Sequence, residues 1–161
     1  SFRSVSISFR EFTPPGCADS ETRDERVEFW SLYLSDEARR RRMWVAEVNS
    51  AILGIAQVGD SIDGYEFVDD ISRLYGGNIA VLYALHVDPD HRGRGIGRAL
   101  IGAAYRYMDR SGFDMSVLDT HETNARARAF YEAAGWVHGD TVTNANGIRI
   151  ALYATTLTDA G

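Results

Sequence analysis

The chemistry that this sequence supports most clearly is the binding of a phosphate-containing ligand at a glycine-rich turn. The run Arg92-Gly93-Arg94-Gly95-Ile96-Gly97-Arg98 lies between a predicted strand, Ile79–Val87, and a predicted helix. Such a turn presents several backbone N–H groups at the positive end of the helix dipole. Glycine lets the backbone approach an anion closely, and the arginines add charge-assisted hydrogen bonds. We therefore predict a pyrophosphate site at residues 92–98.

The spacing of the glycines separates the classes of nucleotide that could bind at this turn. The P-loop pattern G-x-x-x-x-G-K-[ST] is absent, and the dinucleotide pattern G-x-G-x-x-G would need a glycine where the chain has Arg98. A P-loop or NAD-binding protein is therefore disfavoured. A flexible turn without a ligand is the remaining alternative, and the arginines at a helix start argue against it.

Two motifs resemble those of the GNAT superfamily of acyl-CoA N-acyltransferases. Arg92–Gly97 matches its Q/R-x-x-G-x-G/A signature, and Leu85–Pro89 matches the L-x-V-x-P strand end that precedes it. A second block follows as Asn124-x-x-Ala127-x-x-x-Tyr131-Glu132-x-x-Gly135-Trp136, with Trp136 in place of the usual phenylalanine. The order of predicted strands and helices agrees as well, so the resemblance covers essentially the whole chain.

The resemblance implies acetyl-CoA (coenzyme A) as co-substrate, and it implies the cofactor contacts. The pantetheine arm would lie between two splayed strands and bond to the backbone of Leu85 and Val87. The pyrophosphate would lie on residues 92–98, and Asn124 and Tyr131 would contact the arm or stand near the thioester sulfur. The predicted cofactor-binding residues are Leu85, His86, Val87, Arg92, Gly93, Arg94, Gly95, Ile96, Gly97, Arg98, Asn124 and Tyr131.

The implied chemistry is direct attack of a neutral amine on the thioester, in a ternary complex. The N–H of Val87 would stabilise the developing oxyanion, and Tyr131 would act as general acid toward the leaving thiolate. A packing role for Tyr131 is the alternative. The base stays open, because Ile79–Val87 lacks the glutamate that many family members carry there. The candidates are Tyr83 on the face of Leu85 and Val87, Asp119 beyond the next strand, the loop residue His121, Glu66, or a water chain.

Eleven elements are expected to position these groups, in the order β-α-α-β-β-β-α-β-α-β-β. Alternating and continuous apolar runs predict strands at Val5–Phe12, Trp44–Glu47, Ala51–Val58, Ile79–Val87, Met115–Leu118, Trp136–Thr143 and Ile148–Leu157. Helical spacing predicts two helices within Thr22–Arg42, one from about Ile96 to Gly112, and one capped by Thr123 or Asn124. Gly59–Asp70 is predicted to be an acidic loop.

These elements predict an α/β (α+β) fold in a single domain over residues 1–161. In the fold that the resemblance implies, about four helices flank a mixed, mostly antiparallel sheet of about seven strands. The fourth and fifth strands are expected to splay apart. His86 should point opposite to Val87 by strand alternation and serve a structural role.

Composition limits the remaining functional classes. The chain has 161 residues, a single cysteine and a net charge of −6, without the clustered positive charge of a nucleic-acid binder. No uncharged run approaches the ~20 residues of a membrane span, and the four histidines lack metal-site spacing. We expect a soluble, cytoplasmic protein without nucleic-acid or membrane partners.

The acceptor is expected to be a primary amine of a small molecule or peptide. Acidic residues of the 59–70 loop could attract a cationic acceptor, or they could simply be solvated. A protein N-terminal or lysine acetyltransferase, and a non-catalytic acyl-CoA-binding module, are the alternatives. Family habit makes a homodimer possible.

Overall fold

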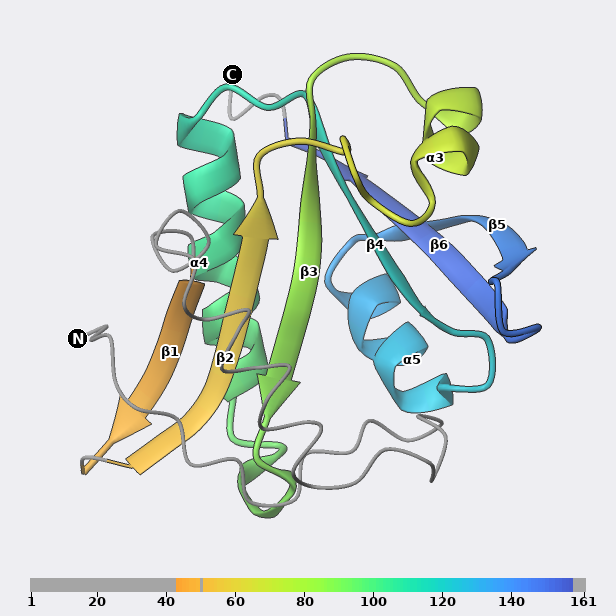
Figure 1. Ribbon diagram of the computed structural model, residues 1–161. Helices are drawn as coiled ribbons and strands as arrows, with labels where there is room; N and C mark the ends of the chain where they lie inside the picture. The colour runs from red at the N-terminus through yellow and green to blue at the C-terminus, as the bar shows by residue number, and fades with distance from the viewer. Residues whose placement is uncertain (1–42, 50, 158–161) are drawn as a thin grey trace.

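The computed structural model describes residues 43–49 and 51–157. The strand predicted at Val5–Phe12 and the two helices predicted within Thr22–Arg42 lie outside the described residues. The strands are β1 Met43–Val48, β2 Ala51–Gly59, β3 Ile79–Val87, β4 Met115–His121, β5 Val137–Thr143 and β6 Arg149–Thr156 (Figure 1). The helices are α3 Val68–Leu74, α4 Ile96–Arg110 and α5 Ala125–Ala133, with a short 3-10 turn at Pro89–His91.

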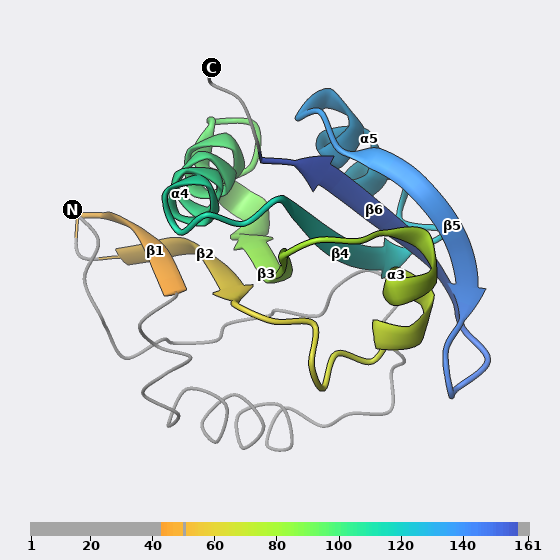
Figure 2. The same cartoon turned by 90° about the horizontal axis from the view of Figure 1, so that it is seen from above.

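The described strands form one six-stranded sheet in the order β1-β2-β3-β4-β6-β5. Within it β3 and β4 pair in parallel, and the other neighbours pair antiparallel. Helices α4 and α5 cover one face, and α3 lies on the other (Figure 2). The predicted mixed, mostly antiparallel sheet is therefore confirmed.

Strand alternation divides the core between these two faces, because successive side chains of a strand point in opposite directions. Ala80 and Leu82 pack with Ile101 of α4 and Tyr131 of α5, whereas Val81 packs with Ile71 of α3. Strand β3 is thus buried on both sides, which explains its nearly continuous apolar sequence.

Strands β3 and β4 separate soon after they begin, as predicted (Figure 1). Their pairing ends at Val81 and Val117. On its other edge, β3 pairs Leu82 with Val58 and Ala84 with Gln57, so that Tyr83 is an extra residue in the ladder. This is a β-bulge, which bends a strand and increases its twist. The bulge immediately follows the last pair with β4, so it lies where the strands diverge.

Two local expectations need correction. Residues 68–74, which the sequence places partly in an acidic loop, form helix α3. The helix is too short to be stable alone, and it is stabilised by tertiary packing, since its Ile71 side chain is fully buried. Strand β4 also runs beyond Leu118 to His121. Asp119 and His121 are therefore strand residues rather than loop residues.

Candidate active site

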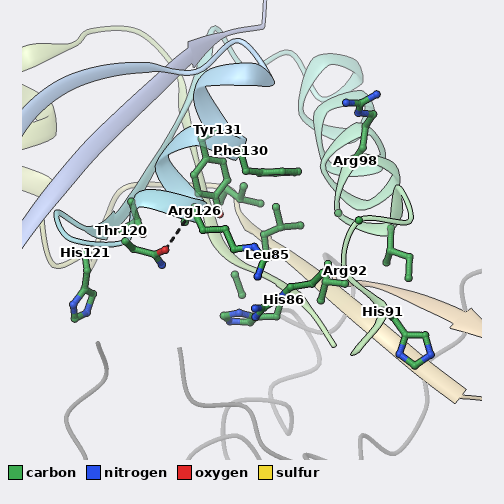
Figure 3. Close-up of a pocket in the computed structure, with 18 of the residues that line it drawn as sticks. Leu85, His86, His91, Arg92, Arg98, Thr120, His121, Arg126, Phe130 and Tyr131 are labelled. Carbon is green, nitrogen blue, oxygen red and sulfur yellow. Dashed lines mark hydrogen bonds between the residues drawn. The ribbon is translucent and has the colours of Figure 1, made fainter. Parts of the chain in front are cut away.

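A pocket of about 640 Å³ opens where β3 and β4 diverge. Its walls come from β3, the glycine-rich turn, the start of α4, the end of β4 and helix α5 (Figure 3). The pocket gathers the predicted cofactor-binding and catalytic residues with the exceptions of Arg94 and Glu66, which do not line it. Residues from two sequence motifs thus meet in one cavity.

The backbone of β3 faces this cavity at the positions that the motif indicates. The N–H of Asp88 donates to the Leu53 carbonyl at 2.7 Å, and Val87 lies opposite Gly54. In an antiparallel ladder that arrangement makes Val87 and Gly54 a non-hydrogen-bonded pair. The N–H of Val87 therefore points away from β2, toward the side from which β4 has diverged. Leu85, two residues earlier and opposite Ala56, is likewise in a non-hydrogen-bonded pair, so its N–H points to the same side.

The glycine-rich turn has the backbone geometry of an anion site. Gly93 and Gly95 have φ angles of 76° and 82°, which favour glycine. Gly95 caps α4, and the N–H of Ala99 donates to its carbonyl at 3.0 Å. The N–H groups of residues 96–98 precede the helical ladder and lie at the positive end of its dipole. Nothing lies within 4 Å of a Cβ placed at Gly93 or Gly95, so the turn leaves room for a ligand.

Three arginines, Arg92, Arg98 and Arg126, line the pocket together with His86. Arg92 and Arg126 extend toward His86 and Leu85, whereas Arg98 extends along α4 away from them (Figure 3). Burial, with Arg92 nearby as a second cause, lowers the pKa of His86 to about 4, so its ring is neutral at pH 7. Arg126 was not predicted. Arg126 lies in the first turn of α5, where a positive charge is unfavourable next to the positive end of the helix dipole. That unfavourable position was the only feature of the sequence that could have indicated a functional role for it.

Helix α5 begins at Asn124, whose side-chain oxygen accepts a hydrogen bond from the Ala127 N–H at 3.1 Å. This cap, one of the two predicted, brings Phe130 and Tyr131 to the pocket wall (Figure 3). The Tyr131 ring is 9% exposed and packs edge-on against Phe130 and Trp136. Burial, and secondarily Asp119, raise its pKa well above that of an ordinary phenol, so Tyr131 keeps its proton at neutral pH.

Asp119 lies on β4 at the end of the pocket near Tyr131. The hydroxyl of Tyr65 donates a hydrogen bond to its Oδ1 at 2.5 Å. Burial raises the pKa of the Asp119 carboxyl, while the Tyr65 hydrogen bond and nearby His121 act in the opposite direction. A carboxylate with a raised pKa is suited to accept a proton near neutral pH.

The other two predicted base candidates in the pocket are less well placed. The bulge turns Tyr83 away from the face of Leu85 and Val87, contrary to the strict alternation assumed from sequence. Its ring packs edge-on against Tyr65 with centroids 5.7 Å apart, whereas Leu85 packs against the core on the α4 side. His121 points away from Tyr131 (Figure 3).

Among residues 43–49 and 51–157, no group of three or more His, Cys, Asp or Glu side chains is arranged to hold a metal ion. In the same part of the chain, no helix is both long and apolar enough to cross a membrane.

Known proteins share both the sequence pattern and the fold. A mycothiol acetyltransferase of Salinispora tropica is 32% identical over 101 residues, which are 62% of this chain and 32% of that protein. The chain thus spans about a third of the length of this curated relative. The structure of the ribosomal-protein-S18-alanine N-acetyltransferase of Escherichia coli superimposes with a TM-score of 0.59 at 21% identity, covering 81% of this chain and 78% of the other.

A second solved structure contains the ligand that the motifs imply. It is a streptothricin acetyltransferase of Bacillus anthracis in complex with acetyl coenzyme A, with a TM-score of 0.59 and 19% identity over 71% of this chain and 61% of the other. The sequence model of the acetyltransferase (GNAT) family matches residues 5–136, which is most of the chain. The protein therefore belongs to the acetyltransferase (GNAT) family.

Proposed function

We propose that this protein transfers an acetyl group from acetyl-CoA to a primary amine, by direct attack within a ternary complex. The observation that carries the proposal is the open edge of β3, where the Val87 N–H faces a pocket between diverging strands. Membership of the acetyltransferase family, and the fold shared with a structure that holds acetyl coenzyme A, support it.

The residues of the pocket fit an acyl-CoA. The backbone of Leu85 and Val87 would bond to the pantetheine amides, since both present their polar groups to the gap. The N–H groups of residues 96–98 would hold the pyrophosphate. Arg92 and Arg126 would add charge-assisted contacts to phosphate oxygens. Asn124 retains its amide N–H₂ for the pantetheine arm, because its helix-capping contact uses only the side-chain oxygen.

Three groups would carry the chemistry. The Val87 N–H stabilises negative charge on the thioester oxygen as the amine attacks. Asp119 accepts the proton that the amine nitrogen loses as the new N–C bond forms. Tyr131 donates a hydrogen bond, and then a proton, to the sulfur as the C–S bond breaks. The products are an acetamide and the free thiol of CoA.

The acceptor is proposed only as a class. The names of the similar proteins include a ribosomal-protein alanine and an antibiotic as acceptors, so both protein and small-molecule amines occur among them. An acetyltransferase for protein N-termini or lysines is the second candidate. A homodimer and a cytoplasmic location stay predictions.

The decisive experiment is an assay of thiol release from acetyl-CoA, with amines, polyamines, aminoglycosides and peptides as acceptors. We expect release that depends on both acetyl-CoA and an amine. Tight binding of CoA without release for any amine would contradict the proposal and favour a non-catalytic binding module.

The base assignment makes a separate prediction for Asp119→Asn. Asp119 must be ionised to accept a proton, so activity should fall as pH drops through its pKa, which burial raises above the usual carboxyl range. The variant should lose about 100-fold or more in kcat/KM and lose this acid limb. The control is Asp140→Asn, which removes an exposed partner of Arg73 outside the pocket. An unchanged acid limb in Asp119→Asn would exclude Asp119 as the base.

A further inference from the structure

The Asp119 carboxylate is held by a residue from a distant part of the chain. Tyr65 precedes helix α3, 54 positions before Asp119, and its hydroxyl donates to Oδ1 of the carboxylate. Tyr65 does not line the pocket, whereas Asp119 does. The contact thus comes from a residue outside the pocket, and it uses Oδ1 of the carboxylate.

The Tyr65 ring is fixed on several sides. It is 5% exposed and packs edge-on against Phe67 and Tyr83, with centroid distances of 5.6 and 5.7 Å. Its backbone is tied as well, since its N–H donates to Ile62 and its carbonyl accepts from the Val68 N–H. A phenol restrained in this way holds its hydroxyl in one place.

Helix α3 explains why the ring is so firmly placed. Phe67 precedes its first turn, and Ile71 is fully buried among β3, β4 and β6 residues on that face of the sheet. The helix therefore anchors the segment that carries Tyr65. Helix α3 thus fixes Tyr65, and the Tyr65 hydroxyl in turn holds Asp119, which lines the pocket.

We infer that Tyr65 is a positioning residue for acetyl transfer, which orients the Asp119 carboxylate so that Oδ2 meets the incoming amine. The inference rests on the proposed function, and it assigns a role to a residue outside the pocket. Tyr65 exchanges no proton with the substrate. Its hydroxyl reduces the rotational freedom of the carboxylate and stabilises the ionised form by hydrogen bonding.

Burial raises the pKa of the Asp119 carboxyl, and the groups that face it modify that rise. They are Tyr65 through the hydrogen bond, His121 further along β4, and Tyr131 from α5. The Tyr65 hydrogen bond lowers the pKa of Asp119 and so offsets part of the rise that burial causes. Removal of the Tyr65 hydroxyl should therefore raise the pKa of Asp119 further.

The test is Tyr65→Phe, which removes the hydroxyl and keeps the buried ring. The acid limb of kcat/KM should move to higher pH, with a loss of about tenfold to a hundredfold near neutral pH. Carbon-13 NMR of aspartate-labelled protein, with Asp119 assigned from Asp119→Asn, reads the same titration without turnover. Its midpoint should move to higher pH, while affinity for CoA stays unchanged.

The matched control is Tyr107→Phe. It removes a second phenol–carboxylate hydrogen bond, from Tyr107 to Asp60 at 2.9 Å, at a site that does not line the pocket. If the wild type is active but the Asp119 midpoint is unchanged in Tyr65→Phe, the inference alone is overturned. Equal loss of activity in both variants, without a shift of the acid limb, would show a merely structural role. Absence of thiol release in the wild type would instead overturn the proposed function and the inference with it.

Discussion

Tyr131 combines two properties that bear on its role as a proton donor. It is buried against Phe130 and Trp136, and burial raises its pKa well above the ordinary value. The phenol therefore stays protonated at neutral pH, but it is a weaker acid than a thiol of pKa about 8.5. Its contribution should come largely from a hydrogen bond that strengthens as the sulfur gains charge.

The corresponding prediction concerns Tyr131→Phe. We expect kcat to fall by about 100-fold, the lower end for general acid catalysis, because proton transfer from this phenol is uphill. The dissociation constant for CoA, measured by calorimetry, should stay nearly the same. Tyr105→Phe is the control, since its exposed hydroxyl lies outside the pocket and makes only a long contact to the Thr156 carbonyl. Weaker CoA binding in step with the fall in kcat would show that Tyr131 packs the pocket and does not act as an acid.

The residues that sequence could and could not identify differ in how they reach the site. Arg92 to Arg98 and Tyr131 lie within two linear motifs, so their types and spacing were visible. Tyr65 reaches Asp119 across 54 positions, and only the folded chain brings the two together. Arg126 lies inside the second motif at a position that the motif leaves unspecified.

At the scale of elements, the course of β3 was only partly predictable. Its apolar run indicated a buried strand, and the structure confirms Ile79–Val87. The bulge at Tyr83 depends on pairing with β2, which a run of apolar residues does not encode. Strict alternation consequently placed Tyr83 on the wrong face. The same bulge precedes the edge of β3 that forms the pocket, so the irregularity missed from sequence contributes to the site.

Gly54 tests how closely β2, β3 and α4 must approach one another. A Cβ at this position would lie 2.7 Å from the His86 carbonyl oxygen and 2.8 Å from Leu100 Cδ1. The carbonyl is backbone and cannot rotate away, so Gly54→Ala should destabilise the fold by about 1–3 kcal/mol through overpacking. Urea unfolding measures the change.

Gly102→Ala, in helix α4, is expected to change the stability in the opposite direction. Gly102 lies inside α4, and its added Cβ would meet only the end of the flexible Arg106 side chain at 3.5 Å. Relief of the helix penalty of glycine should stabilise the protein by about 1 kcal/mol. Equal stability of Gly54→Ala and the wild type would show that β2 can move away from β3 and α4 without cost.

Across the part of the chain that the structure describes, the sequence predicted the strands of the sheet better than the helices. Six of the expected strands match described strands, because period-two and continuous apolar runs report which faces are buried. Helix α3 was missed because its seven residues carry little helical signal and depend on Ile71 packing against the sheet. That dependence also hid Tyr65, which α3 anchors.

The buried His86 makes the stability of the whole fold depend on pH. Its pKa is about 4 in the folded protein and about 6.5 in an unfolded chain, so between these values the unfolded state binds more protons. Stability should therefore fall as pH drops through this window, with His86 contributing about 2 kcal/mol of loss between pH 7 and pH 5. Asp119 acts in the opposite direction, because its folded pKa is raised. Urea unfolding of the wild type and of His86→Gln at pH 7 and pH 5 measures the contribution of the histidine to this loss. The variant should lose less stability on acidification than the wild type. An equal loss in both proteins would mean that the His86 ring becomes protonated in the folded protein without cost.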